Sequence, residues 1–216
     1  MDVMTLRRNL LLNNDLPFGY KRLQYLESNG NQYINLGYYL GSKDKVKIDV
    51  NVMRHNFANG RDVNYILGYY SSGKKYAIQR NRNGGGNSAF LYDTWDSSGG
   101  FYAYPYQTIV HIEVSKDGYF LDGNLLQHNN YAYDYVSFYL QGEFTTSAPA
   151  YLLWANGTSQ DKAIARIYSF VIEDNNGIQM NLIPCVRKSD NKPGMYDKVS
   201  GAFLTNQGTG EFIIPS

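Results

Sequence analysis

The sequence predicts an all-β protein, a two-sheet antiparallel sandwich preceded by a short N-terminal helical arm. Three observations lead to this prediction. Apolar and polar residues alternate with a period of two in many short segments, as in strands with one buried face. Turn signals recur about every eight to twelve residues, a spacing typical of sandwiches. The 216 residues include 21 tyrosines and 10 phenylalanines, and aromatic residues favour strands.

The most regular stretch is Thr108–His128. Val110, Ile112 and Val114 are expected to point into the core, since apolar residues at alternate positions share one face. The residues between them are expected to point outward: His111, Glu113 and Ser115. Lys116–Gly118 and Asp122–Gly123 are sequences that favour tight turns. The stretch therefore predicts a meander of three antiparallel strands.

Two other segments have clear patterns. Lys45–Val52 alternates, which predicts a strand with one wet face. Ile164–Glu173 is apolar on both faces, which predicts a central strand, and the turn Asp174–Gly177 is expected to return the chain into Ile178–Ile183. Tyr20–Glu27 is expected to pair with Gln32–Leu36 through the turn at Ser28–Asn31. The remaining predicted strands are Asn64–Tyr70, Lys75–Arg80, Ser88–Thr94, Phe101–Tyr106, Tyr131–Tyr139, Tyr151–Trp154, Met195–Asp197 and Ala202–Thr205.

Met1–Asn14 is the only candidate helix, and Pro17 follows its expected end. Its apolar residues include Val3, Leu6, Leu10 and Leu11. So short a helix is marginal alone in water and is expected to dock on something. It can dock on its own domain, or on a neighbouring subunit or a larger assembly. We interpret residues 1–17 as an assembly or docking arm and residues 18–216 as one β-sandwich.

Composition limits the classes of function. The net charge is +1, and because nucleic-acid-binding proteins usually carry a basic excess, nucleic acid is not an expected partner. One cysteine excludes a disulfide within the chain. No export signal is recognisable, and no apolar run approaches the length of a membrane span. We therefore expect the chain to be made in a reducing cytoplasm.

No motif in the sequence indicates catalysis, so the protein is not expected to be an enzyme or to need a cofactor. The three histidines, His55, His111 and His128, lack the spacing of a zinc site. Calcium is not supported by the spacing of the loop acids. Cys185 follows a proline after an apolar strand and is interpreted as a buried hydrophobic residue. A sandwich glycosidase is disfavoured because Glu113 has no second carboxylate at an alternate position of its strand.

A binding surface is the remaining possibility. Aromatic residues crowd a stretch rich in Gly, Asp and Ser, and the candidate ligand contacts there are Trp95, Asp96, Tyr102 and Tyr104. Aromatic rings can stack on the faces of sugars, while a carboxylate accepts hydrogen bonds from hydroxyls. The alternative is that these rings only fill the core or a sheet edge.

Several segments resemble a known family. VHIEVSKDGYFLDGNLL (Val110–Leu126) and ARIYSFVI (Ala165–Ile172) resemble strands of laminin-G-like, concanavalin A-like jelly rolls. GYKRLQYLESNGNQYINLG (Gly19–Gly37) and NLIPCVRKSDNKPGMYDKVSGAFLTNQGTGEF (Asn181–Phe212) resemble segments of bacteriophage virion proteins and of phage-like proteins in gut bacteria. The resemblance implies two facing antiparallel sheets in a jelly roll, and a role in structure or attachment, often to carbohydrate. It carries over no catalytic or calcium-binding residue.

The expected function is therefore a non-catalytic structural or attachment protein of a tailed bacteriophage virion, such as a head or tail decoration or a fibre module. The arm would contact other virion proteins or further copies of the chain, and the sandwich would contact host-surface carbohydrate. The expected location is the virion, after synthesis in the host cytoplasm. The alternative is a stand-alone glycan-binding module of a bacterial surface.

Overall fold

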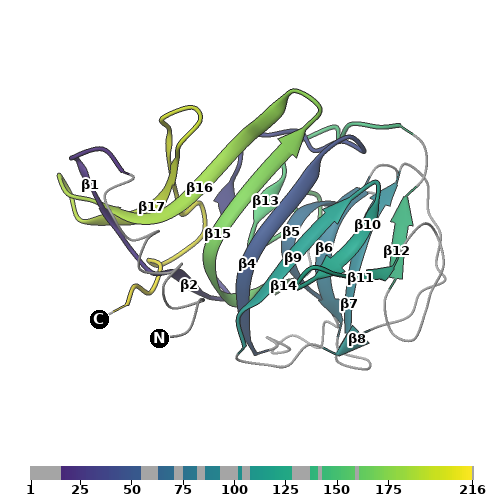
Figure 1. Cartoon of the computed structure of the whole chain (residues 1–216). Helices are drawn as coiled ribbons and strands as arrows, with labels where there is room; N and C mark the ends of the chain where they lie inside the picture. Colours follow the sequence, from purple (N-terminus) through teal and green to yellow (C-terminus); the bar gives the residue numbers. More distant parts are fainter. Residues whose placement is uncertain are drawn as a thin grey trace, which may run out of the picture.

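The computed structural model of the chain describes residues 16–54, 63–70, 75–81, 86–92, 102–103, 108–127, 137–140, 143–158 and 161–215. These residues contain strands and no helix, which confirms the all-β prediction. Two sheets face each other as in a sandwich (Figure 1). The predicted helix at Met1–Asn14, with Val3, Leu6, Leu10 and Leu11, lies outside the described residues.

The larger sheet has ten strands. Its main path runs in the order β11 (Asn124–Gln127), β10 (Gly118–Leu121), β9 (Val110–Ser115), β4 (Lys45–Arg54), β15 (Ile164–Asp174), β16 (Gly177–Arg187), β17 (Lys192–Asp197) and β18 (Phe203–Thr205). Two short strands join from the side, β1 (Tyr20–Arg22) next to β16 and β2 (Leu26–Asn29) next to β15. All these pairs are antiparallel.

The smaller sheet has eight strands. Its main path runs in the order β12 (Ser137–Leu140), β7 (Gly86–Tyr92), β6 (Lys75–Asn81), β5 (Val63–Tyr70), β13 (Tyr151–Leu152) and β3 (Ile34–Asn35). Two further strands lie off this path, β14 (Asp161–Lys162) next to β5 and β8 (Tyr102–Ala103) next to β7. The β12–β7 and β14–β5 pairs are parallel, so the sheet is mixed and not wholly antiparallel as predicted.

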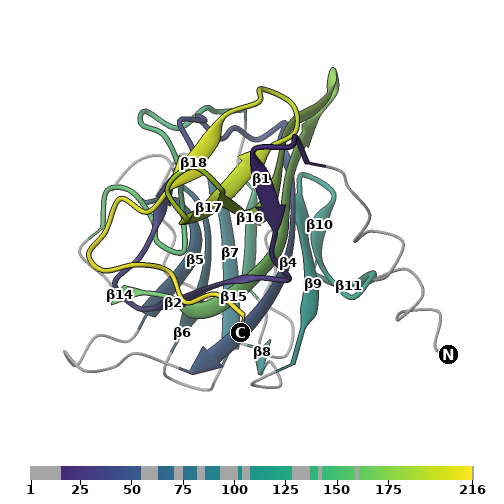
Figure 2. The ribbon, with the colours of Figure 1, turned by 90° about the vertical axis from the view of Figure 1, so that its left-hand side faces the viewer.

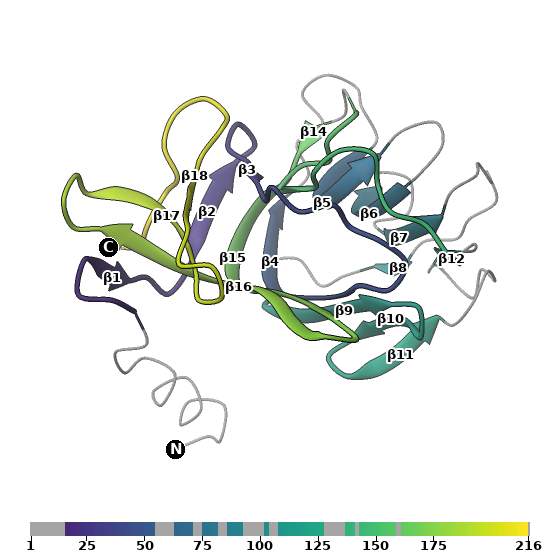
Figure 3. The ribbon, with the colours of Figure 1, turned by 90° about the horizontal axis from the view of Figure 1, so that it is seen from above.

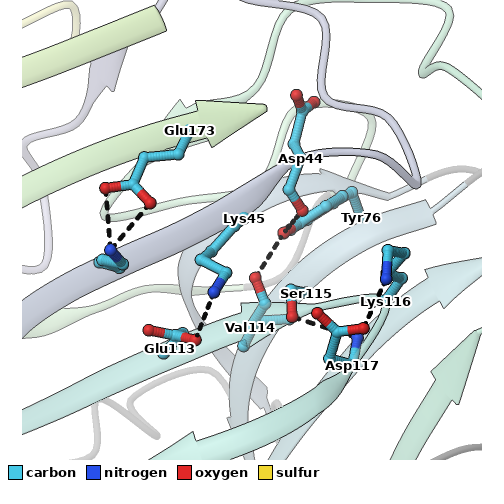
Figure 4. A network of polar contacts seen from close by, with 10 residues as sticks. Asp44, Lys45, Tyr76, Glu113, Val114, Ser115, Lys116, Asp117 and Glu173 are labelled. Carbon is cyan, nitrogen blue, oxygen red and sulfur yellow. Dashed lines mark hydrogen bonds and ion pairs between the residues drawn. The ribbon is translucent and has the colours of Figure 1, made fainter. Parts of the chain in front are cut away.

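The core lies between the two sheets. Val46, Ile48 and Val50 of β4 are fully buried, as the alternation of that strand predicts. Tyr76 of β6 is also fully buried, and its hydroxyl lies 3.1 Å from the carbonyl oxygen of Val114 and 3.2 Å from that of Asp44 (Figure 4). A buried hydroxyl needs such partners. Tyr76 therefore links the two sheets by hydrogen bonding as well as by packing.

The central meander and the central strand are confirmed. β9, β10 and β11 are joined by the predicted turns, in which Asp122 and Gly123 have φ of 50° and 80°. β15 has neighbours on both edges, as its two apolar faces predict. One side chain of the meander differs, because Ser115 is buried and not outward. Its hydroxyl accepts a hydrogen bond from the backbone N–H of Asp117 at 3.1 Å, so the side chain of Ser115 stabilises the turn that follows β9.

Two predictions about the N-terminal strands are wrong. Tyr20–Glu27 is not one strand, because β1 pairs with β16 whereas β2 pairs with β15. Gln32–Leu36 does not return beside it, since only Ile34–Asn35 forms a strand and it pairs with β13 of the smaller sheet. The chain crosses from one sheet to the other between β2 and β3. Local alternation cannot distinguish this crossing from a hairpin, because both begin with a turn.

Other predicted strands shift in their bounds. The strand expected at Ser88–Thr94 is β7, Gly86–Tyr92. Of Phe101–Tyr106, only residues 102–103 are described, and they form β8. Of Tyr131–Tyr139, only residues 137–139 are described, and they belong to β12.

Buried polar groups fix the corner where the chain crosses between the sheets. Ser28 and Gln32 are almost fully buried there. The side-chain oxygen of Gln32 accepts a hydrogen bond from the N–H of Asn29 at 2.9 Å, and the hydroxyl of Ser28 accepts one from Gly30 at 3.0 Å. Gly30 has φ of 97°, a conformation that a residue with a Cβ rarely adopts. The turn that sequence reasoning places here is thus a corner between two layers.

The C-terminal segment 206–213 holds this corner closed, and we call the corner and this segment together the terminal clasp. The side-chain NH2 group of Gln32 donates a hydrogen bond to the carbonyl of Thr209 at 3.1 Å. The backbone N–H of Tyr33 donates one to the side-chain oxygen of Asn206, also at 3.1 Å. Backbone bonds also join residue 27 to residue 213 and residue 31 to residue 209. A Cβ on Gly208 would lie 2.0 Å from the carbonyl oxygen of Asn31, so the two segments touch at backbone distance.

The terminal clasp lies beside β2, β3 and β18, away from the meander (Figures 2 and 3). The two segments that carry the resemblance to virion proteins, Gly19–Gly37 and Asn181–Phe212, contribute most of this region. They are far apart in the sequence and adjacent in the fold.

Candidate binding surface

The structure leaves the predicted ligand contacts undecided. Trp95, Asp96 and Tyr104 lie outside the described residues. The backbone of Tyr102 belongs to β8, but its side chain is not among those described. These residues remain a prediction.

A different group of aromatic residues gathers on the outer face of the smaller sheet. Tyr33, Tyr151 and Trp154 form this group, which we call the aromatic cluster. Its ring centroids are 4.9 Å apart for Tyr33 and Tyr151, 5.0 Å for Tyr33 and Trp154, and 5.6 Å for Tyr151 and Trp154. All three side chains are partly buried. Tyr151 lies opposite Asn35 of β3, whereas the next pair, Leu152 and Ile34, points into the core.

The backbone at Leu153 brings Trp154 next to Tyr151. Leu153 is buried and has φ of 69°, an unfavourable conformation for a residue with a Cβ. Its N–H donates to the carbonyl of Ile66 at 2.7 Å, and its carbonyl accepts from Ala163 at 3.0 Å, so neighbouring segments hold the conformation. In an extended strand, positions 151 and 154 would lie on opposite faces. The positive φ breaks that alternation.

A lysine completes the aromatic cluster. The ammonium nitrogen of Lys162 lies 4.4 Å from the ring centroid of Trp154 and 5.6 Å from that of Tyr33. Burial, together with the nearby Tyr33, raises the pKa of Tyr151. The cluster therefore offers aromatic rings, two phenol hydroxyls and one cation. Such a set suits contact with a polar ligand that has apolar faces, such as a sugar.

The outer face of the larger sheet carries paired charges. Lys45 of β4 contacts Glu113 of β9 at 3.0 Å, and Lys47 contacts Glu173 of β15 at 2.8 Å (Figure 4). Both pairs are diagonal, because Lys47 lies directly opposite Glu113 and Lys45 directly opposite Glu173, and diagonal neighbours on adjacent strands are within reach of long side chains. These side chains stabilise neighbouring strands and neutralise one another. Glu113, the isolated acid of the sequence, is therefore part of an ion pair.

Asp49, His111 and Ser169 also meet on this face, but not in the order of a catalytic triad. Nδ1 of His111 lies 2.8 Å from one carboxylate oxygen of Asp49, and the hydroxyl of Ser169 donates to the other at 2.5 Å. In a catalytic triad the histidine lies between the nucleophile and the acid. Here the acid lies between the other two, so the hydroxyl of Ser169 bonds to the carboxylate and not to the histidine. The group is a polar contact across three strands.

This contact predicts a pH dependence of stability. The hydrogen bond to Asp49 raises the pKa of His111 above 6.5, although burial opposes it, and Glu113 and Asp122 add to the rise. Burial by itself would raise the pKa of Asp49, but hydrogen bonds from His111 and Ser169 outweigh it and hold the pKa below 3.8. The stability from His111 is complete below its ordinary pKa and is lost as pH rises through the folded value.

Melting temperatures measured from about pH 2 to about pH 9 test this dependence. We expect the wild type to lose its advantage over His111→Gln as the pH rises through the folded pKa of His111. A second loss is expected under acid conditions, as the pH falls through the folded pKa of Asp49. A constant difference between the two proteins at every pH would contradict the contact.

Cys185 is fully buried in β16, as the sequence predicts. Burial raises the pKa of its thiol to about 12. A thiol with so high a pKa is protonated at neutral pH, and the thiolate is the reactive form. Cys185 therefore contributes packing.

The sequence contains Tyr33, Tyr151 and Trp154 in predicted strands, but no local signal brings them together, because their meeting depends on the β3–β13 pair and on the conformation of Leu153.

Within the described ranges, no group of three or more His, Cys, Asp or Glu side chains could hold a metal ion. The described residues also include no helix that could cross a membrane. Comparison of the chain with protein-family models, curated proteins and solved structures finds no match.

Proposed function

We propose that this protein is a non-catalytic structural or attachment component of a tailed bacteriophage virion, a head or tail decoration or a fibre module. In this proposal the sandwich is a jelly roll of the concanavalin A-like type. The observation that carries the proposal is the terminal clasp. The two segments on which the resemblance rests, Gly19–Gly37 and Asn181–Phe212, pair with each other in the fold.

The clasp supports the proposal because it gives the two segments that carry the resemblance a structural role, which is to join the ends of the domain. The buried side chains of Ser28 and Gln32 are hydrogen-bonded within the corner and to residue 209, whereas one guanidinium nitrogen of Arg22 is buried without a partner among the described residues. A region with this role gives a self-contained module that can be attached to different assemblies. Residues 1–17 would place the module, by contact with other virion proteins or with further copies of the chain.

The aromatic cluster supports contact with host-surface carbohydrate. Its rings are partly exposed, and the strained conformation of Leu153 is maintained although it is unfavourable. Backbone strain of this kind is often found at ligand sites.

The virion location is tested on particles purified from the host that carries the gene. We expect an antibody against the protein to label intact particles in electron micrographs. A variant lacking Met1–Asn14 should remain folded but no longer join the particles. Particles without the protein would overturn the proposal, and a protein found on the bacterial envelope would favour the alternative glycan-binding module.

Carbohydrate contact is tested on a glycan array. We expect selective binding that Tyr151→Ala weakens about fivefold or more, since a stacked aromatic residue contributes on the order of 1–3 kcal/mol. Tyr25→Ala is the matched control, because Tyr25 is also partly buried and packs on another tyrosine, Tyr168, at 5.6 Å. Equal losses in both variants would place the binding elsewhere, and an unresponsive wild type would leave a purely structural role.

A further inference from the structure

A pocket of about 460 Å³ opens between the loop Tyr38–Asp44 and the segment Glu143–Thr145. Three hydrogen bonds join its two walls. The N–H of Ser42 donates to the carbonyl of Phe144 at 3.0 Å, the N–H of Phe144 to the hydroxyl of Ser42 at 3.1 Å, and the N–H of Thr146 to the carbonyl of Leu40 at 2.8 Å. The pocket is thus preformed, and its volume suits a small ligand.

A buried carboxylate lies among the lining residues. Asp44 is only 6% exposed. Its oxygens accept hydrogen bonds from the N–H of Gly41 at 2.6 Å and from the hydroxyl of Tyr38 at 3.0 Å. Both donors are neutral, and within the described part of the chain Asp44 forms no ion pair. Its negative charge is therefore hydrogen-bonded but not neutralised.

The charges of the lining residues do not balance. Lys43 and Glu143 pair with each other at 3.1 Å, and both side chains are largely exposed. One positive and two negative side chains line the pocket, which leaves one negative charge, that of Asp44. Burial raises the pKa of Asp44 in spite of its donors, as expected of a carboxylate without a cation. Burial and the charges of Asp44 and Asp174 also raise the pKa of Tyr38.

The ligand that best matches these groups is a compact cation with several hydrogen-bond donors. A primary ammonium group has three donors and a single charge. The rings of Tyr38 and Tyr39 also line the pocket, and aromatic faces attract ammonium groups. A calcium ion fits less well, because it takes six to eight oxygen ligands, and no group of three or more potential ligands occurs in the described residues.

We propose that this pocket binds a primary ammonium group, carried by an amino sugar or by a lysine side chain, with Asp44 as its counter-ion. The site is separate from the aromatic cluster and does not rest on the proposed function. The two sources share one chemistry, a protonated amine, and differ in what surrounds it.

Titrations of the full chain followed by amide chemical shifts test the proposal. We expect glucosamine or Nα-acetyl-lysine amide to shift the backbone signals of Gly41, Lys43 and Thr145. The fully acetylated forms, N-acetylglucosamine and Nα,Nε-diacetyl-lysine amide, carry no charge and should leave them unchanged. The tighter of the two amines identifies the source. Equal shifts from amines and acetylated forms would overturn the proposal, as would the same shifts with calcium alone or no shift with either amine.

A pair of variants separates a specific effect of the Asp44 carboxylate on amine binding from the effect of the protein's net charge. Asp44→Asn should weaken amine binding about tenfold or more, since a hydrogen bond to a charged group contributes roughly 1.5–3 kcal/mol. Asp190→Asn removes the same charge at an exposed position next to Arg187 and should leave binding unchanged. Equal affinities in both variants would overturn the role of Asp44. If Asp44→Asn does not fold, the titrations of the wild-type protein with amines and with their acetylated forms still test whether the pocket binds an ammonium group.

Discussion

Replacing Asp197 with alanine is expected to lower the free energy of unfolding by about 3–5 kcal/mol. Asp197 ends β17 and is 2% exposed. One of its carboxylate oxygens accepts hydrogen bonds from the N–H groups of Asn181 and Val199, at 2.9 and 3.1 Å. The other accepts from the N–H and the hydroxyl of Ser200, at 3.2 and 2.5 Å. The substitution removes the acceptor for four donors.

Urea denaturation measures this loss, read as a lower midpoint at an unchanged slope. Asp190→Ala is the matched control, because Asp190 also accepts a backbone N–H in a neighbouring turn but is exposed. Its loss should be much smaller, since solvent replaces its contacts. If both variants lost the same free energy of unfolding, the burial of Asp197 would not be the cause of its contribution to stability.

Replacing Gly68 with alanine is expected to cost about 2–6 kcal/mol, the sum of backbone strain and overpacking. Gly68 has φ of 141°, and a Cβ there would lie 2.2 Å from the carbonyl oxygen of Tyr76 and 2.6 Å from the Cα of Ala77. Backbone atoms of a paired strand cannot move aside without breaking the pair. Gly68 also lies opposite Tyr151 of β13, so the change affects both neighbours of β5.

Gly123→Ala separates the two causes in a thermal or urea denaturation experiment. Gly123 has φ of 80°, but no atom lies within 4 Å of the position its Cβ would take. It should therefore show backbone strain alone, about 1–2 kcal/mol. If Gly68→Ala is no more destabilising than Gly123→Ala, the close approach of β5 and β6 at Gly68 is wrong.

Strands with a regular local pattern could be predicted from the sequence. In β4 and β9 apolar and polar residues alternate almost throughout, so burial follows largely from position, although Asn51 and Ser115 are buried as well. β15 is apolar at most positions, which indicates a strand in the middle of a sheet. Short strands could not be placed in this way. β1, β2 and β3 have two to four residues each, and their partners are set by segments more than a hundred residues away.

The candidate sites could not be predicted for the same reason. The aromatic cluster depends on φ at Leu153, which no residue type in that segment requires. The pocket at Asp44 is lined by two segments about a hundred residues apart in the sequence. Asp44 itself precedes a predicted strand and looks like an ordinary loop acid. Sequence reasoning instead selected the aromatic residues around Trp95, which lie outside the described part of the chain.

The terminal clasp has a consequence for synthesis. A ribosome makes the chain from the N-terminus, so β1 and the β2–β3 corner emerge long before residues 185–213, to which they bond. The buried amide of Gln32 has to wait for the carbonyl of Thr209, which is 177 positions further along the chain. Nascent chains that stall before residue 209 would therefore leave the corner open and expose both layers to chaperones or proteases.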